Sequence, residues 1–249
     1  MIQENCCSPD TGRCLKLFKI EIFREERILD ERNRQQMILQ MIRKEKIVAI
    51  VRGIPSGLIL DTGRALADGG ICMMEVTFDH SGPEGIRETL HSIALLKEHL
   101  SERMHIGAGT VLTAEEAEEA YRSGAEYIIS PNVDRSVIEK TKELGLISMP
   151  GAFTPSEIVD AYNYGGDIIK LFPAGLLGVS YIKAVRGPLS HIPMAAVGGV
   201  TPENICQFTA AGVACFGIGS NLVNQSLTVS HDFENLTERA LAFRNALGE

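Results

Sequence analysis

The sequence has no hydrophobic run long enough to cross a membrane. No apolar run reaches the roughly 18 residues of a transmembrane helix, and no apolar export signal opens the chain. Basic charge is also scarce, because 24 Lys and Arg stand against 32 Asp and Glu and give a net charge of −8. This balance argues against nucleic acid as a main partner. We expect a cytoplasmic globular protein with no membrane or nucleic-acid partner.

Metal-ligand spacing is also missing. None of the six cysteines has zinc-ligand spacing, and in a reducing cell we expect no disulfide framework. Among the histidines, only His80 lies near the C-terminal end of a predicted strand. A metal site needs several ligands that converge at one place. We therefore expect neither a metal nor another cofactor.

The length of 249 residues suits one large α/β barrel domain. Residues 1–36 differ from the rest, with three cysteines and then a charged run from Arg24 to Arg34. We interpret this segment as an N-terminal extension, disordered or loosely helical. Alternatively, it is upstream sequence joined by a misplaced start, with Met37 as another possible start. Residues 37–249 form the predicted barrel domain.

From Lys46 onward, short β-rich runs alternate with helical stretches, which is typical of βαβ units and a parallel sheet. Eight such units match a closed (β/α)₈ TIM barrel. Helix starts support this prediction, since Thr154-Pro155-Ser156-Glu157 is a capping box, and Ser81–Glu84 and Thr113–Glu116 have the same form. The predicted strands are Ile47–Val51, Ile71–Val76, His105–Ala108, Tyr127–Ile129, Ile147–Met149, Ile168–Leu171, Met194–Val197 and Val213–Gly217.

Reactive groups of such barrels lie at the C-terminal ends of the strands, and Lys170 and Glu75 fall at two of these ends. Burial disfavours a charged ammonium group, so Lys170 either extends to the surface or serves as a neutral amine that attacks a carbonyl. Glu75 either neutralises Lys170 or Arg52 in a buried pair or carries protons for that amine. Together the two residues predict a Schiff-base centre.

Glycine turns follow the seventh and eighth predicted strands, at Gly198-Gly199 and at Gly219-Ser220. This is the usual place for a phosphate in such barrels, because bare backbone N–H groups and a helix N-terminus hold the anion. The sequence therefore predicts a phosphorylated small-molecule ligand.

Several motifs resemble one family in order and spacing between about Lys46 and Val223. They resemble the 2-keto-3-deoxy-6-phosphogluconate aldolases, a family that includes phosphogalactonate and 4-hydroxy-2-oxoglutarate aldolases. The motifs are Glu75-Val76-Thr77, Gly107–Leu112, Ile129-Ser130-Pro131, Lys170–Ala174, Gly198-Gly199-Val200 and the Gly219-Ser220 turn.

The resemblance implies a homotrimeric class I aldolase that needs no metal. Lys170 matches the Schiff-base lysine and Glu75 the general acid and base. Thr110 matches a residue that holds the pyruvate carboxylate, and Arg52 a basic group near the substrate. The remaining matches are Thr77, Pro131 and Phe172 for substrate and Gly198, Gly199, Gly219 and Ser220 for phosphate.

One position departs from the family pattern, because Asp79 stands where the family usually has an arginine that pairs with the pyruvate carboxylate. Asp79 either turns away and caps the helix that begins near Ser81 or bonds a hydroxyl of a different substrate. We expect cleavage of a 2-keto-3-deoxy-6-phospho sugar acid to pyruvate and glyceraldehyde 3-phosphate. The alternatives are a 4-hydroxy-2-oxoglutarate aldolase, a phosphosugar epimerase or isomerase, and a non-catalytic phospho-ligand binder.

Overall fold

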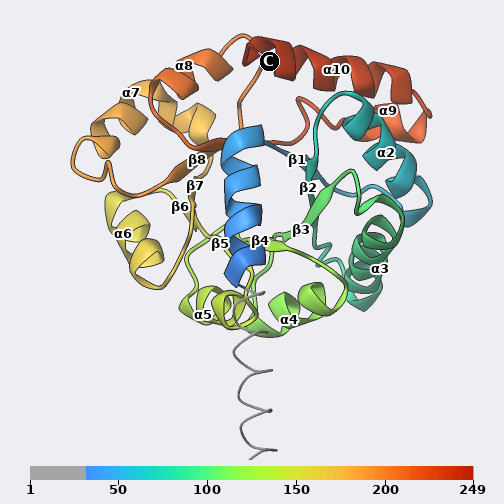
Figure 1. Cartoon of the computed structure of the whole chain (residues 1–249), viewed down its shortest axis with the longest axis horizontal. Coiled ribbons are helices and arrows are strands. Elements are labelled where there is room, and N and C mark those ends of the chain that lie inside the picture. Colours follow the sequence, from blue (N-terminus) through green and yellow to red (C-terminus); the bar gives the residue numbers. More distant parts are fainter. Residues whose placement is uncertain (1–31, 249) are drawn as a thin grey trace, which may run out of the picture.

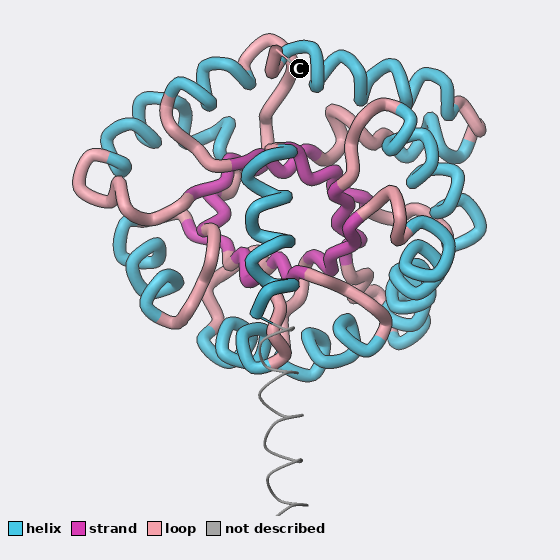
Figure 2. The backbone as a smooth tube through the Cα atoms, viewed as in Figure 1, coloured by secondary structure: helices cyan, strands magenta, loops and turns pink. Residues whose placement is uncertain are grey.

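The computed structural model describes residues 32–248, and the chain folds around a barrel of parallel strands (Figures 1 and 2). The strands follow the order β5-β4-β3-β2-β1-β9-β8-β7-β6, and every neighbouring pair is parallel. Their bounds are β1 Ile47–Val51, β2 Met73–Thr77, β3 His105–Gly109, β4 Tyr127–Ile129, β5 Ile147–Met149, β6 Gly151–Ala152, β7 Ile169–Leu171, β8 Met194–Val197 and β9 Cys215–Ile218.

All eight predicted strands are present, and the fifth, β5, is followed after Pro150 by the short strand β6, which was not predicted. Proline has no N–H to donate to a ladder, so a strand is interrupted at that residue. The Pro150 carbonyl still accepts the Lys170 N–H at 2.9 Å. The strands at the two ends of the order, β5 and β6, are thus joined through Pro150, and the sheet closes on itself. The predicted (β/α)₈ barrel is confirmed.

A ring of helices surrounds the strands (Figure 1). Within the described residues, none of the helices is long and apolar enough to cross a membrane. The bounds of the ring helices are α2 Ser56–Asp68, α3 Pro83–Leu100, α4 Ala114–Arg122, α5 Arg135–Glu143, α6 Pro155–Asn163, α7 Ala174–Arg186, α8 Ile205–Ala210, α9 Gln225–Val229 and α10 Phe233–Ala246.

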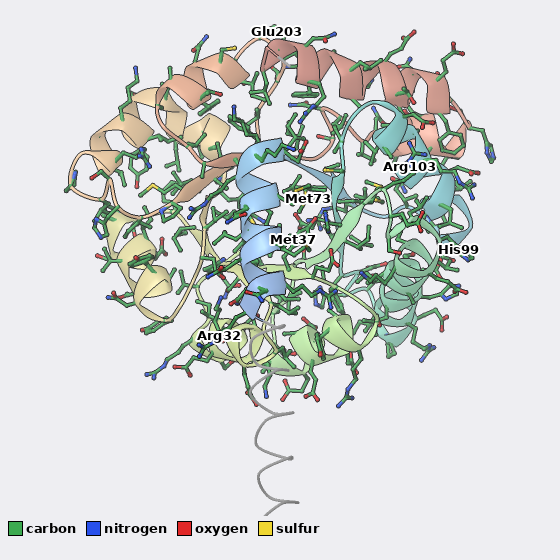
Figure 3. The ribbon with its side chains drawn as sticks, viewed as in Figure 1. Arg32, Met37, Met73, His99, Arg103 and Glu203 are labelled. Atoms are coloured by element: carbon green, nitrogen blue, oxygen red, sulfur yellow. The ribbon has the colours of Figure 1, made fainter. Side chains whose placement is uncertain are left out.

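Residues 32–45 form a further helix that lies across one end of the barrel (Figure 1, blue; Met37 is labelled in Figure 3). Ile38 and Ile42 are buried in one cluster with side chains from inside the barrel. Gln35 Nε2 donates to the Leu146 carbonyl just before β5, at 2.9 Å. The helix therefore closes the N-terminal end. This helix continues through residue 36, the predicted end of the N-terminal extension, so no break in the structure marks that boundary, which remains a prediction. Residues 1–31 lie outside the described part of the chain.

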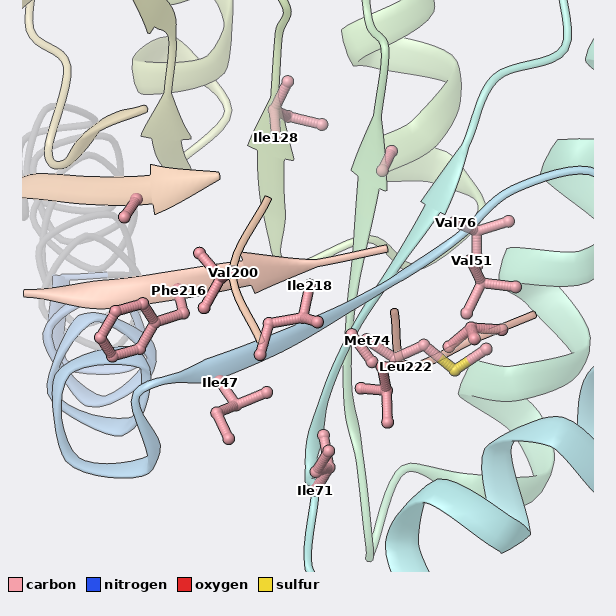
Figure 4. Packing of buried hydrophobic residues seen from close by; sticks show 14 of the residues in the cluster. Ile47, Val51, Ile71, Met74, Val76, Ile128, Val200, Phe216, Ile218 and Leu222 are labelled. Carbon is pink, nitrogen blue, oxygen red and sulfur yellow. The ribbon is translucent and has the colours of Figure 1, made fainter. Parts of the chain in front are cut away.

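Apolar side chains on the outer face of the barrel pack against the helices. Ile47, Met74, Phe216 and Ile218 belong to this cluster and are at most 1% exposed (Figure 4). Full burial of one such side chain stabilises the fold by roughly 1.5–3 kcal/mol. Close packing of this kind fixes the positions of the strands relative to the helices around them.

The helix starts confirm two of the three predicted caps. Thr154 and Glu157 form the full capping box of α6. Thr113 caps α4 by accepting the Glu116 N–H, although the Glu116 carboxylate bonds the Leu112 N–H instead. The Ser81 prediction is wrong, since Gly82 is the N-cap of α3 and gives no side-chain bond. The Ser81 N–H instead donates to Asp79 Oδ1, which holds Ser81 in the preceding loop.

Candidate active site

Glu75 lies in the middle of β2, and its side chain is almost fully buried at 1% exposure. Its Oε2 has no hydrogen-bond partner among the described residues. Burial is the largest influence and raises the pKa of this carboxyl, while the charges of Lys170 and Arg52 partly lower it. A buried oxygen without a donor is costly, and a catalytic role is one of the reasons for which such an oxygen is found in a protein.

Gly109, on the neighbouring strand β3, makes room for this carboxylate. A Cβ atom at Gly109 would lie 1.6 Å from Glu75 Oε1, which no side chain could tolerate. The backbone of Gly109 also pairs with Thr77 in the β2–β3 register. Thr77 lies two residues beyond Glu75 on the same strand and is buried, so it faces the same side as Glu75.

Lys170 lies on β7 and is 6% exposed. Burial is the largest influence and lowers the pKa of its ammonium group; Glu75 opposes this shift and Arg52 adds to it. Its Nζ lies 5.1 Å from the centre of the Phe172 ring, close enough for a cation–π contact when the amine is charged. Lys170 therefore loses its proton more readily than a surface lysine does, and the neutral amine is the form that attacks carbonyls.

Further predicted site residues surround Lys170. Gly151 pairs with Lys170 across the β6–β7 register. A Cβ at Gly151 would lie 2.3 Å from the Pro131 carbonyl oxygen, so the Pro131 loop lies against this strand. The Phe172 ring would meet a Cβ at Gly198 at 3.4 Å. Pro131 and Phe172 also line one hollow of about 410 Å³. The structure thus gathers Pro131, Phe172 and Gly198 around the lysine.

Arg52 and Thr110 belong to the half of the site that contains Glu75. Arg52 Nη2 donates to Thr110 Oγ1 at 3.1 Å, and Arg52 is exposed beyond the end of β1. Thr110 has a φ of 58°, a left-handed backbone conformation that is uncommon for a β-branched residue. Such strain clusters at ligand sites. The Arg52 charge lowers the pKa of both Glu75 and Lys170, so it links the two halves of the site.

The glycine turns lie where the sequence predicts a phosphate. Gly198 and Gly199 have φ values of 85° and 78°, and Gly175 at the start of α7 donates its N–H to the Gly198 carbonyl at 2.8 Å. Within residues 32–248, the N–H groups of Gly199, Val200 and Ser220 donate to no acceptor. Free N–H groups on two adjacent turns can hold an anion.

Asp79 is exposed and turns onto the loop before α3. Its Oδ1 accepts the Ser81 N–H at 2.9 Å, and this hydrogen bond is the largest cause of its lowered pKa. The first alternative from the sequence expected Asp79 to turn away and cap α3, but the N-cap of α3 is Gly82, and Asp79 bonds the loop before the helix instead. Asp79 and Thr77 line a separate hollow of about 250 Å³ beside α2 and α3, of which neither Glu75 nor Lys170 is a lining residue.

Sequence reasoning missed two features of this site. The first is the role of Gly109, for which the Gly-x-Gly pattern of residues 107–109 inside a strand was the available signal. The second is the contact of His80 Nε2 with Glu116 Oε1 at 2.9 Å, which joins the loops after β2 and β3. His80 and Glu116 are far apart in sequence, so only the fold brings them together.

A buried lysine in β7 and a buried glutamate in β2, with glycine turns after β8 and β9, are typical of the class of (β/α)₈ barrel enzymes. Comparison with known proteins narrows the class. The model of the family "KDPG and KHG aldolase" matches residues 38–239. The 2-dehydro-3-deoxy-6-phosphogalactonate aldolase of Escherichia coli (strain K12) is 33% identical over 210 residues, which cover 84% of this chain and 100% of the relative.

A 2-dehydro-3-deoxy-phosphogluconate aldolase of Haemophilus influenzae is 30% identical over 204 residues, 81% of this chain and 92% of the relative. A solved structure described as native KDPGal has a TM-score of 0.73 at 34% identity and covers 81% of this chain and 93% of its own. A KDPG aldolase from Legionella pneumophila, with pyruvate captured as a covalent carbinolamine, has a TM-score of 0.72 at 26% identity. The match covers 80% of this chain and 93% of that aldolase.

The chain belongs to the KDPG and KHG aldolase family. It is therefore an aldolase, and aldolases are lyases. These relatives do not favour a phosphosugar epimerase or isomerase, nor a non-catalytic binder.

Proposed function

We propose that the chain cleaves a 2-keto-3-deoxy-6-phospho sugar acid to pyruvate and glyceraldehyde 3-phosphate through a Schiff base on Lys170. One observation supports this most strongly. A buried lysine with a lowered pKa lies on the same barrel end as a buried glutamate whose pKa is raised and whose Oε2 has no partner within residues 32–248. Opposite shifts of two titratable groups are a common basis for assigning an acid or base and a nucleophile.

In the first stage, neutral Lys170 attacks the C2 ketone and forms a carbinolamine. Loss of water then gives a protonated imine, in which nitrogen withdraws electrons from C3. Glu75 donates the proton that the departing hydroxyl needs, and its raised pKa makes that proton available. After this transfer Glu75 is a carboxylate beside a cationic imine.

In the second stage, the Glu75 carboxylate takes the proton of the C4 hydroxyl, directly or through a water. The C3–C4 bond then breaks, the aldehyde leaves, and the bonding electrons pass into an enamine on Lys170. Protonation of C3 by Glu75 and hydrolysis of the imine release pyruvate and restore the amine. Each proton that Glu75 gives it also regains, so no other acid or base is required.

The rest of the site fits the two ends of such a substrate. Thr110 and Arg52 offer donors for the carboxylate. The free N–H groups of Gly199, Val200 and Ser220 suit the 6-phosphate. Thr77, Pro131 and Phe172 are the proposed contacts for the carbon chain. We further propose a homotrimer, which light scattering on the purified chain tests directly.

The test of the proposed function is a coupled assay for pyruvate release. The panel contains the gluconate and galactonate forms of the phosphorylated keto acid, which differ at C4, and 4-hydroxy-2-oxoglutarate. We expect pyruvate from at least one phosphorylated acid and none from the Lys170→Arg variant. Isomerisation of a phosphosugar without pyruvate would support an epimerase or isomerase instead. Binding without any turnover would support the non-catalytic binder.

A further inference from the structure

His80 and Glu116 lie outside the groups that the proposed reaction uses, yet they join two loops of the site. His80 follows β2 by three residues and its ring stacks on Phe78, with centroids 6.1 Å apart. His80 Nε2 meets Glu116 Oε1 at 2.9 Å, and Glu116 Oε2 accepts the Leu112 N–H at 2.7 Å. The Glu116 side chain is nearly buried. One carboxylate therefore holds both the loop after β2 and the loop after β3.

The loop held by Glu116 includes Thr110, which contacts Arg52. Leu112 follows Thr110 by two residues, and Thr110 Oγ1 accepts from Arg52 Nη2 at 3.1 Å. Thr110 keeps its left-handed backbone, with a φ of 58°, only if its surroundings enforce it. The Phe78 N–H donates to the Gly109 carbonyl at 2.8 Å, so the two loops are also joined immediately before Thr110.

We propose that His80 is a positioning residue for Arg52, and that it acts through Glu116 and the Thr110–Leu112 turn. This inference rests on the proposed function for its kinetic consequences but not for its structural ones. Loss of His80 frees the Glu116 carboxylate on one side, loosens the Thr110 turn and moves the Arg52 guanidinium. The charged groups that face His80 are Glu116 across the two loops and the adjacent Asp79.

A purely structural role predicts something different. His80 is partly exposed, and a surface pair of this kind contributes little to the stability of the fold. If the His80–Glu116 contact mattered only for the fold, its loss would lower the melting temperature slightly and leave the site unchanged. A positioning residue would alter the reactivity of Lys170, because the Arg52 charge acts on that amine.

The first experiment needs no turnover. Lys170 in the free protein is acetylated with acetic anhydride over a range of pH values, and the extent is read by mass spectrometry. Arg52 favours the neutral amine, so Arg52→Gln should shift the labelling profile of Lys170 to higher pH. We expect His80→Ala to shift it in the same direction and His80→Gln, which still donates to Glu116, to leave it near wild type. A His80→Ala profile identical to wild type would overturn the inference.

The second experiment is kinetic and uses a double-mutant cycle. We expect His80→Ala to lower kcat/KM by about 3- to 10-fold, the size usual for coupling within one hydrogen-bond network. In an Arg52→Gln background, the same change should have no further effect. Additive losses would show that His80 does not act through Arg52. Absence of turnover in the wild type would count against the proposed function alone, because the labelling experiment still decides the role of His80.

Discussion

Each end of the barrel buries a glutamate, and the two carboxyl groups respond to burial in opposite ways. Glu75 at the C-terminal end is 1% exposed and its pKa is raised. Glu126 at the N-terminal end is 7% exposed, and its pKa is lowered to about 2. Burial is the largest single influence on both and raises the pKa. The difference therefore comes from the hydrogen-bond donors around each carboxylate.

Glu126 receives three charge-assisted contacts. Its oxygens meet His105 Nδ1 at 2.7 Å, Lys97 Nζ at 2.8 Å and Arg34 Nη2 at 3.0 Å. Together these donors outweigh the effect of burial. Glu75 has no such set, and its Oε2 is without a partner among the described residues. The N-terminal end thus satisfies its buried carboxylate with donors, whereas the described residues at the C-terminal end leave one carboxyl oxygen without a donor.

The largest effect that this comparison predicts is at Lys170. Lys170→Arg should lower turnover by on the order of 10⁴-fold or more, as loss of a nucleophile does, because a guanidinium keeps its proton. In the wild type, pyruvate with borohydride should leave a reduced adduct on the peptide that contains Lys170. The matched control is Lys142→Arg at the N-terminal end, where the ion pair with Asp167 is retained. An adduct on Lys183, or none, would contradict the role of Lys170.

The next largest effect is at Glu75. Glu75→Gln should lower kcat by about 10²- to 10⁴-fold, the usual share of general acid and base catalysis. The amide is nearly isosteric with the carboxyl, so we expect the circular dichroism spectrum to be unchanged. Glu126→Gln is the control, and it should leave kcat near wild type. If kcat of Glu75→Gln were unchanged, Glu75 would be only a structural partner of Lys170.

Glu126→Gln should instead reduce stability. The folded pKa of about 2 lies below the unfolded value of about 4.3, so the carboxylate stabilises the fold above about pH 4.3. This contribution is lost as the pH falls toward 2. We expect a loss of roughly 1–2 kcal/mol at pH 7, since solvent reaches Arg34 and Lys97 and screens the pairs. Urea unfolding at pH 7 and pH 3 measures it.

The matched control for Glu126 is Glu118→Gln, which breaks only an exposed i,i+4 pair with Arg122. Its effect should stay within about 0.5 kcal/mol at both pH values. A Glu126→Gln loss that is equally large at pH 3 would show that the carboxylate charge is not what stabilises this end of the barrel.

The sequence predicted most of the fold, because strand and helix signals are local. The period of the β-rich runs and the Thr154 capping box needed no distant contact. The break between β5 and β6 at Pro150 also had a local cause, the missing N–H, although its effect on the ladder depended on Lys170 across the barrel. Ser81 was predicted as a cap because its pattern fits a capping box, but α3 begins at Pro83 with Gly82 as its N-cap, so Ser81 lies one residue before the cap position.

The positions of the candidate site residues could be predicted from the sequence, but their geometry could not. Lys170 and Glu75 lie within β7 and β2, the glycine turns follow β8 and β9, and the barrel brings these strands together. The room that Gly109 leaves for Glu75 and the His80–Glu116 contact depend on pairs of loops that only the fold brings together. The donors around Glu126 come from residues 34, 97 and 105, which are far apart in the sequence, so no sequence motif predicts this set of contacts.

The smallest predicted effect concerns Asp79, which is exposed beside the reactive end. An arginine at this position would offer two donors to a substrate carboxylate, and such charge-assisted bonds are worth roughly 1.5–3 kcal/mol. Exposure and the lost Ser81 contact reduce this gain. We therefore expect Asp79→Arg to tighten pyruvate binding by up to about 10-fold.

The matched control is Asp79→Asn, whose side-chain oxygen can still accept the Ser81 N–H, and it should leave pyruvate affinity nearly unchanged. Calorimetric titration with pyruvate and the pyruvate-release assay, applied to all three proteins, separate two roles. If Asp79 only holds its loop, Asp79→Arg gains affinity and keeps turnover on the phosphorylated acid. If turnover is lost while pyruvate affinity stays flat, Asp79 contacts the part of the substrate that pyruvate lacks. It would then determine specificity, and the loop account would be wrong.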